Sequence, residues 1–500
     1  MSRTSTLNES GEMVIRDAEP ATVATRPRNS FYEGASVGRL TNDWVTREAT
    51  RDSLMESGII RLRARSKQLI ENDGYAINAL RQVLSNVLGD SGFTLKVEAK
   101  NKKNGRDKRA SEEIQMAWKE FCRAENYSVT RDVTEHEFDC LNLTSIFESG
   151  SGLTRMVDNF DNRYRFSLQG IPTALLDPEF NLPARNITMS VEKNGWGEVM
   201  AYHFLQHHPG DRWRGAGAMN GPRQRIVKNQ IIHNFIKKEF GQTQGTPWLA
   251  PVMARLRQLH GYEEAEVVAA RAEASKIIFF EQDVAAPGGG YMGEGEDDMG
   301  NYTMNCEPGT GERLPPGVKP HLLDPNHPNG NYTEFRKGVL RGISSGLITN
   351  YNILGNDLEG VTYSSIRQGV LAERDMWKLL QRWYIETHKK PIFSEWLKWY
   401  LMTGQSKALG MQDYERLNHP EFTGRRWAWV DPDKDSKADE RRLKNGLTSH
   451  QEISRGAGKD FETICEERKE DQSTADSYQL ELFLDMQQQP ETVEVEVAEQ

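Results

Sequence analysis

Three aspartates alternate at Asp431, Asp433 and Asp435, a spacing that could hold a divalent cation. An EF-hand loop begins in the same way, but it places glycine at its sixth position and glutamate at its twelfth. Here those positions are Ser436 and Arg442, so calcium would bind poorly. The same carboxylates could hold Mg²⁺ for hydrolysis of nucleic acid, but we find no supporting lysine or second carboxylate cluster that would complete such a site. We therefore favour a helix N-terminal cap by Asp435.

Other motifs give no catalytic constellation. The GGGYMGEG string at 288–295 follows a predicted helix rather than a strand and opens no helix, which favours a loop over a dinucleotide site. The sequence contains no GxxxxGK[ST], HExxH or GxSxG. His207 and His208 have no third ligand nearby, and four tryptophans between 377 and 399 are typical of a core or an interface. We expect no enzyme activity, metal or cofactor, which favours a structural or assembly protein.

The composition restricts the class of protein further. A chain of 500 residues predicts about three domains, and 37% hydrophobic residues can form their cores. The mean hydropathy is −0.70, and no segment approaches the roughly 20 apolar residues of a membrane span. The N-terminus has no apolar signal region, so we expect no secretion. Four scattered cysteines without a CxxC motif fit a reducing cytosol.

The charge is concentrated at the C-terminal end. Residues 431–500 carry 19 acidic and 9 basic side chains, which accounts for the whole net charge of −10. From Asp471 to Gln500 there are eight acids and no base, so we expect a solvated, partly disordered tail. The rest of the chain is neutral. A protein that holds DNA phosphates tightly would show a large basic surplus, and this sequence does not.

The first half predicts an α+β body. Residues 1–45 lack periodicity and are expected to form an extended arm. Apolar residues at helical spacing predict a helix that ends before Gly89, and the alternation of FTLKVEA predicts a strand. Ser111 is expected to open another helix, with Trp118 and Phe121 on its buried face. The stretch 128–245 is predicted to be mostly strands, with NGWG as a hairpin turn.

The second half predicts long helices around an irregular insertion. Thr246-Pro247 is expected to start a helix of about 33 residues that runs to Phe280. Residues 281–330 contain 10 Gly and 7 Pro, which predicts loops and short strands. A helix from Thr333 to Ser345, a polar loop, and a helix from about Ser364 that Pro391 breaks come next. Short helices follow from Trp427, and Ser449 and Glu452 match a capping box.

Three strings, in order, resemble the lambda family of bacteriophage portal proteins, from about residue 52 to 470. The first is ENDGYAINALRQVLSNVLGDSGFTLKVEA. The second, LRGISSGLITNYNILGNDLEGVTYSSIRQG, contains Tyr363, Ser364, Ser365 and Arg367. The third begins WAWVDPDKDSKA. Its family-motif residues are Trp427, Trp429, Asp431, Pro432 and Asp435. The chain departs from the family near 148–157 and in its glycine-rich insertion, which leaves the local geometry there open.

The resemblance implies an α+β portal fold that assembles into a ring, usually a dodecamer. It implies a flexible arm, an α+β wing, two stem helices that flank a clip, a channel loop, a long helix with the helix after it, a helical crown and an acidic disordered tail. The arm is expected at 1–45, the wing at 46–245, the two stem helices at 246–280 and 332–347, and the clip between them at 281–331. The channel loop is expected at 348–362, the long helix with the helix after it at 363–426, the crown at 427–480 and the tail at 481–500.

The resemblance also implies a function. Such a ring lies at one vertex of the capsid in the virion, after assembly in the host cytoplasm. It is the conduit for packaging and ejection of double-stranded DNA. Its partners would be further copies of the chain, terminase, head-completion or tail connector proteins, capsid and scaffold proteins, and DNA bound without sequence specificity; no membrane is expected.

The residues agree with a passive conduit. A neutral body would let DNA slide, because each neutralised phosphate adds affinity. The loop 348–362 has no Lys or Arg, so its polar groups would touch a duplex weakly. Its expected channel residues are Asn350, Asn352, Asn356, Asp357, Leu358, Glu359, Gly360 and Thr362. Two alternatives stay open: a metal-dependent DNA-processing enzyme that uses the three aspartates, and another structural head protein.

Overall fold

The structure is a computed structural model of the whole chain, divided into two units, residues 1–54 and 55–500. The residues that it describes are 3–7, 13–17, 48–101, 105, 107–211, 222–274, 278–282, 295–296, 302–303, 318–322, 330–360, 362–427, 432–456 and 461–477.

The first unit contains a β-hairpin where the sequence predicted only an extended arm. Strand β1 (Arg3–Leu7) pairs antiparallel with β2 (Met13–Asp17), with Arg3 opposite Asp17. The unit extends into α1 (Arg51–Glu56), close to the expected helical start.

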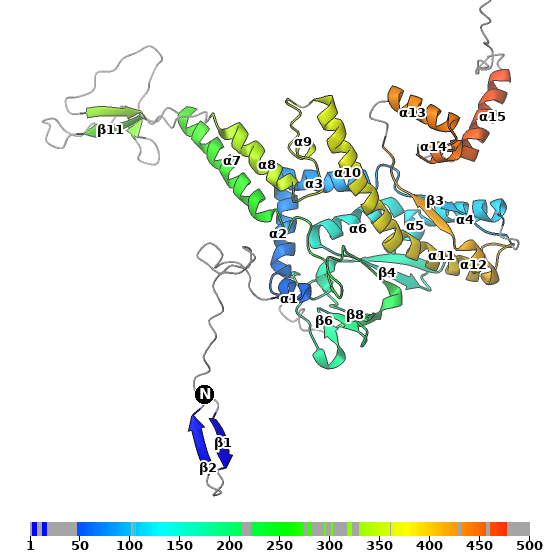
Figure 1. Cartoon of the computed structure of the whole chain (residues 1–500), viewed down its shortest axis with the longest axis horizontal. Helices are drawn as coiled ribbons and strands as arrows, with labels where there is room; N and C mark the ends of the chain where they lie inside the picture. The colour runs from blue at the N-terminus through cyan, green and yellow to red at the C-terminus, as the bar shows by residue number, and fades with distance from the viewer. Residues whose placement is uncertain are drawn as a thin grey trace, which may run out of the picture. The chain divides into compact units, whose positions relative to one another are not determined.

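Helices from distant parts of the sequence share one large core in the second unit (Figure 1). Trp118 and Phe121 are buried there as predicted, against Phe393 and Trp396. The helices of this unit that precede strand β4 are α2 (Ile59–Asn72), α3 (Gly74–Val87), α4 (Lys108–Phe121), α5 (Ala124–Tyr127) and α6 (Glu135–Ser149). The tryptophans 377 and 396 are almost wholly enclosed, which confirms their expected place in the core.

Small antiparallel sheets complete the α+β body. The two larger ones have the orders β10-β4-β5 and β6-β7-β8-β9, and the third, β15-β3, joins residues more than 300 positions apart in the sequence. The strands are β3 (Thr94–Val97), β4 (Gly152–Asp158), β5 (Phe166–Ile171), β6 (Ile187–Thr188), β7 (Val191–Lys193), β8 (Val199–Phe204), β9 (Gln224–Val227), β10 (Ile231–Asn234) and β15 (Pro420–Thr423). The predicted NGWG turn joins β7 and β8, with Gly197 at a φ of 82°.

Two helix starts differ from the prediction. Helix α4 begins at Lys108, because Asp107 caps it by accepting from the Ala110 amide, while the Ser111 hydroxyl donates to the Asp107 carbonyl. Helix α6 lies inside the stretch that was predicted to be mostly strands. A capping box of Thr134 and Glu137 starts it.

Helix α7 (Met253–Ala274) is shorter than predicted. The chain before it crosses another segment so closely that a Cβ on Gly245 would lie 1.9 Å from the Gly150 carbonyl oxygen. Gly150 itself has a φ of 86°. The helix that was expected to begin at Thr246-Pro247 begins only at Met253, after turns at 248–252, and residues 278–280 belong to a strand instead.

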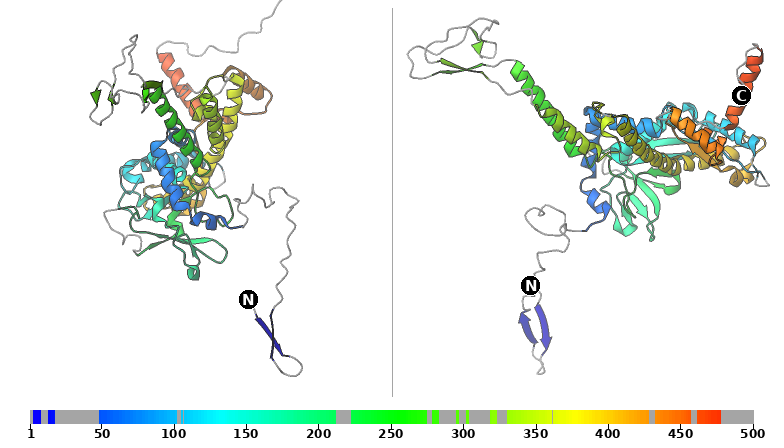
Figure 2. Two further views of the ribbon diagram at one scale, coloured as in Figure 1. Left: turned by 90° about the vertical axis from the view of Figure 1, so that its left-hand side faces the viewer. Right: turned by 45° about the horizontal axis from the view of Figure 1, so that its top comes forward.

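Helix α7 lies beside α8 (Tyr332–Ser344), as both views in Figure 2 show, and Tyr262 packs edge-on against Phe335. The described parts of the insertion are short antiparallel pairs, as predicted. They are β11 (Ile278–Gln282) with β14 (Val318–Leu322), and β12 (Gly295–Glu296) with β13 (Tyr302–Thr303).

Pro391 does not break the long helix, contrary to the prediction. Helix α10 (Tyr363–Tyr384) continues through a wide π-helical turn at Ile385–Lys389 into α11 (Lys390–Met402). In an α-helix the amide of residue 391 would donate to the carbonyl of Thr387, but proline has no amide hydrogen. That carbonyl instead accepts from the Asn234 side chain at 3.0 Å.

Short helices form the C-terminal part, as predicted. They are α13 (Pro432–Lys444), α14 (His450–Gly456) and α15 (Phe461–Ser477); a further short helix, α12 (Tyr414–Leu417), precedes Trp427. The Ser449 hydroxyl accepts from the Glu452 amide, as the capping box requires. Asp435 is the fourth residue of α13, so it is not the N-terminal cap. In the described parts of the chain, every helix is too short or too polar to cross a lipid bilayer.

Candidate functional site

The polar segment 348–362 is more ordered than the predicted loop, because it contains a short helix, α9 (Tyr351–Leu354). Asn350 caps this helix by accepting from the Asn352 amide at 3.1 Å. Leu354 is buried and belongs to the large core. Two of the predicted channel residues, Asn350 and Asn352, are therefore half-buried parts of the framework.

Helices α3 and α10 hold this segment from two sides. Asn78 on α3 donates to the carbonyls of Ile353 and Leu354 at 2.9 and 3.1 Å. On α10, the Glu373 carboxylate accepts from the Asn350 amide at 3.1 Å, and burial raises the pKa of Glu373. A Cβ on Gly369 would lie 2.4 Å from the Asn350 side-chain nitrogen, so a larger residue there would move the Asn350 side chain.

Asp357 is the electrostatic centre of the segment. It accepts hydrogen bonds from the Tyr351 hydroxyl and the Glu359 amide, and Lys337 lies 3.7 Å away. Together these groups lower the pKa of Asp357, with the Tyr351 hydroxyl contributing most. Burial and the hydrogen bond to Asp357 raise the pKa of Tyr351 to about 12. The carboxylate thus stays ionised and fixed at neutral pH.

The tip of the segment faces solvent. Leu358 is 66% exposed, the Glu359 side chain is 81% exposed, and Asn356, Gly360 and Thr362 are also exposed. The backbone turns through positive φ at Asn356 and Gly360, 48° and 68°. Lys337 reaches Glu359 at 3.4 Å, so an acidic tip rests on one cation from α8. Such a surface can touch a polyanion without holding it.

The second set of predicted residues is only partly described. Tyr363, Ser364, Ser365 and Arg367 open α10, but their side chains lie outside the described residues. Trp427 is described, and its indole donates to the Asn86 side chain at 2.8 Å, which joins the end of β15 to α3. Trp429 and Asp431 lie outside the described residues, Pro432 opens α13, and the side chains of Asp433 and Asp435 are not described.

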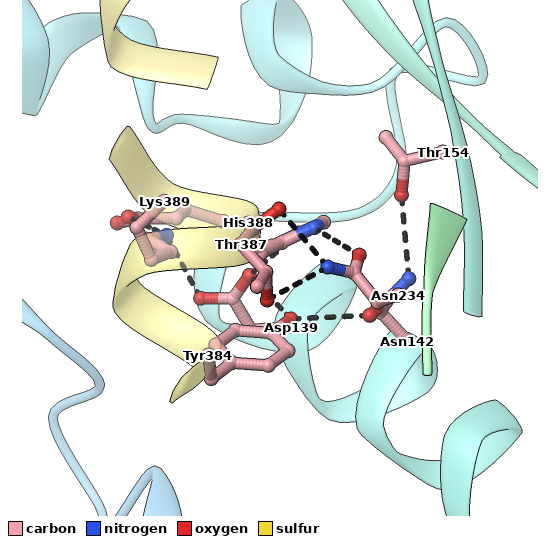
Figure 3. Close-up of polar contacts among 9 residues, drawn as sticks. Asp139, Asn142, Thr154, Asn234, Tyr384, Thr387, His388 and Lys389 are labelled. Atoms are coloured by element: carbon pink, nitrogen blue, oxygen red, sulfur yellow. Dashed lines mark hydrogen bonds and ion pairs between the residues drawn. The ribbon is translucent and has the colours of Figure 1, made fainter. Parts of the chain in front are cut away.

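A buried ionic cluster lies at the π-helical turn (Figure 3), and the sequence did not predict it. Lys389 is wholly enclosed, with its ammonium 2.8 Å from Asp139 and also paired with Glu135. The imidazole Nδ1 of His388 lies 2.9 Å from the Asn234 side-chain oxygen, and its Nε2 lies 3.5 Å from Asp139. The consecutive His-Lys-Lys before Pro391 was the only signal in the sequence.

Opposing effects set the charge states in this cluster. Burial alone would raise the pKa of Asp139, but Lys389 and His388 together lower it. Burial lowers the pKa of His388, although Asp139 opposes this. Burial would also lower the pKa of Lys389, but the two carboxylates outweigh it and raise the pKa. The cluster is a charged clamp between α6 and the π-helical turn. Among the described residues, no group of His, Cys, Asp and Glu has a metal-binding arrangement.

The sequence comparisons agree with one another on a single family. The model of the family "Phage portal protein, lambda family" matches residues 37–381. The chain is 30% identical over 450 residues to the probable portal protein of Halomonas phage phiHAP-1, covering 88% of this chain and 86% of that protein. It is 22% identical over 369 residues to portal protein B of Escherichia phage lambda, covering 67% of each chain.

Structural comparison finds more distant similarity. One similar chain comes from the neck of a native GTA particle computed with C12 symmetry. The TM-score is 0.45 at 13% identity, and the match covers 81% of this chain and 93% of the other. This likeness is too weak to support the conclusions below.

Proposed function

Because this chain belongs to the lambda family of phage portal proteins, we propose that it forms a closed ring at one capsid vertex and conducts double-stranded DNA. The family match over 37–381 carries this proposal. In this proposal, the ring is built of twelve copies. It docks terminase and connector proteins and contacts capsid and scaffold proteins. It assembles in the host cytoplasm and remains in the virion.

The parts of the subunit take the predicted roles. Residues 46–245 form the wing, α7 and α8 the stem, 281–331 the clip, and 427–480 the crown. The stem assignment is supported by how α7 is buried. Leu256 and Leu259 are enclosed in the core, whereas Val267 and Val268 are 51% and 56% exposed. Neighbouring copies in a ring would cover the exposed half.

The segment 348–362 is proposed as the channel loop. Its framework is fixed by Asn78 and Glu373, while its tip is exposed and acidic. A rigidly held, negatively charged tip repels phosphates at close range and so guides a duplex without binding it. The loop would therefore limit sideways motion of DNA and leave sliding free.

The proposal is tested by deleting residues 355–360, which leaves α9 and α10 intact, and by imaging the protein in negative stain. We expect rings with a central hole for both proteins, and a large loss of packaged DNA for the deletion in a packaging assay with terminase. Normal DNA packaging by the deletion variant would contradict the assignment of 348–362 as the channel loop. An absence of rings in the unmodified protein, under all conditions, would remove the portal proposal itself.

The ring is proposed to be passive, with ATP hydrolysis supplied by terminase, since the sequence has no Walker motif. The enzyme alternative predicts Mg²⁺-dependent cleavage of DNA that Asp433→Ala abolishes. We expect no cleavage by either protein. The alternative of another head protein predicts shells or sheets in place of rings in the same images.

A further inference from the structure

A groove of about 1290 Å³ lies between α10, α4, the β3–β15 sheet, the chain at 424–427 and α15. Its walls are rigidly connected. The Gln381 side-chain nitrogen donates to the carbonyls of Asn86, Val87 and Arg425 at 3.1 to 3.2 Å. Lys108 on α4 pairs with Glu462 on α15 at 3.2 Å. The groove is therefore bounded by packed elements on the side of Gln381 and by an ion pair to α15 on the side of Lys108.

The groove is lined by more cations than anions. Eight Lys and Arg side chains line it, against six Asp and Glu. Three of the cations are paired within the groove: Lys108 with Glu462, Lys378 with Asp375, and Lys390 with Glu386. Arg382 and Arg426 are exposed, and their guanidinium groups make no hydrogen bond or ion pair with another described residue. These two guanidiniums are available to an acidic ligand.

We propose that the groove binds the C-terminal segment of its own chain, residues 478–500. This segment carries six acids and no Lys, Arg or His. Between Val493 and Val497 valine alternates with glutamate, so an extended chain would present carboxylates on one side and valines on the other. The carboxylates would meet Arg382 and Arg426, and the valines would meet Leu371, which is 42% exposed.

The position of the segment supports binding within one subunit. Helix α15 ends at Ser477, and its own Glu462 and Glu466 line the groove. Glu466 is about 16 Å from that end at 1.5 Å per helical residue, whereas the 23 residues that follow can span about 75 Å. The tether therefore allows the segment to return, and it raises the effective concentration of the segment at the groove to about millimolar.

A peptide fits this groove better than a nucleic acid does. The six carboxylates in the lining would repel a continuous row of phosphates, and the net charge of the lining is only slightly positive. Separated carboxylates on a flexible chain can reach the two guanidiniums and avoid the acids. The segment would thus cover the cationic side of the groove and keep other polyanions away from it.

The test uses the chain truncated after Ser477 and a fluorescent synthetic peptide of residues 478–500, with binding read by anisotropy at low salt. We expect the truncated protein to bind the peptide, and the full chain to bind it at least about tenfold more weakly because its groove is occupied. Equal binding by both proteins would show that the segment does not occupy the groove of its own chain, and would overturn the proposal.

Variants locate the binding. Arg382→Ala with Arg426→Ala in the truncated protein should weaken peptide binding about tenfold, since two charge contacts are lost. The matched control, Lys119→Ala with Lys407→Ala, removes two exposed positive charges outside the groove and should bind normally. Equal loss in both double variants, or binding of a 30-base-pair duplex that the peptide cannot displace, would overturn the proposal. The assay requires no ring, so its outcome is independent of the portal function.

Discussion

Lys389 shows how a single buried charge organises this protein. Its side chain has no exposed surface, and its ammonium pairs with Asp139 and Glu135, which come from a helix about 250 positions earlier in the sequence. Buried ion pairs of this kind add little net stability when complete, but removal of one partner leaves an uncompensated charge in the core. The clamp therefore specifies where α6 meets the π-helical turn.

Lys389→Met should lower the free energy of unfolding by about 3–5 kcal/mol, because Asp139, which is buried, and Glu135 would lose the ammonium that compensates their charges. Urea unfolding followed by circular dichroism measures this. Lys390→Met is the control, since Lys390 is 38% exposed and pairs with Glu386 on the surface; its cost should stay below about 1 kcal/mol. Similar costs for both variants would mean that the clamp does not specify the packing.

Two histidines, His388 and His233, should make stability depend on pH. Burial lowers the pKa of His388. Burial also lowers the pKa of His233 to about 3, and the positive charge of Arg63 adds to this effect. A lowered pKa means that the unfolded chain binds more protons, so stability is complete above about pH 6.5 and falls as the pH drops. Each histidine contributes up to about 1.4 kcal/mol per pH unit. In urea unfolding between pH 7 and 5, His388→Asn and His233→Asn should each show a shallower slope than the unmodified protein, and unchanged slopes would refute this.

At the scale of elements, the π-helical turn and Asn234 together allow proline inside a long helix. The Asn234 side-chain nitrogen donates to the Thr387 carbonyl, to which Pro391 has no amide hydrogen to donate. The Asn234 side-chain oxygen lies 2.9 Å from His388 Nδ1. Sequence rules predict a break at this proline because they consider only the local chain. The partner that removes the penalty comes from β10, which is about 150 residues away.

A double-mutant cycle tests this arrangement. Asn234→Ala should cost about 2–3 kcal/mol, because it leaves buried polar groups without partners. In the Pro391→Ala background the cost should be about 1 kcal/mol smaller, since the new amide at 391 can donate to the Thr387 carbonyl. Chemical denaturation of the four proteins gives the coupling. Strictly additive costs would show that the two residues act independently.

The sequence predicted elements where burial follows local periodicity and missed those that depend on distant partners. The sequence correctly predicted that Trp118 and Phe121 lie on the buried face of a helix, because apolar residues recur there at helical spacing. Helix α6 was missed because Asp139 and Asn142, both buried, interrupt its apolar pattern. Their partners, Lys389 and Tyr384, lie far away in the sequence.

At the scale of the whole molecule, the single subunit leaves apolar surface uncovered on the second half of α7. In the proposed ring this surface lies between neighbours. Val268→Glu should keep the subunit folded, with its melting temperature changed by less than about 2 °C, yet prevent closed rings, because a charge would be buried without a partner. Size-exclusion chromatography with light scattering and negative-stain images measure both. Glu264→Gln, at another exposed position of the helix, should assemble normally.

The sequence predicted that the segment 348–362 has an exposed polar part, but not the framework that holds it. Polar residues without Lys or Arg indicated an exposed loop, and Asn356, Leu358, Glu359 and Gly360 at the tip are exposed. The cap at Asn350 and the bond from Asn78 depend on helices that meet only in three dimensions, so periodicity could not predict them. Assembly of copies lies beyond what one chain's pattern determines.

The π-helical turn also affects how relatives of this chain should be aligned. A wide turn of this kind accommodates one residue more than an α-helix of the same length. A relative with an uninterrupted helix would therefore need a one-residue gap between 385 and 389. An alignment that forbids gaps there would shift every later position of α11, from Ile392 to Leu401, by one residue, which is about 100° around the helix.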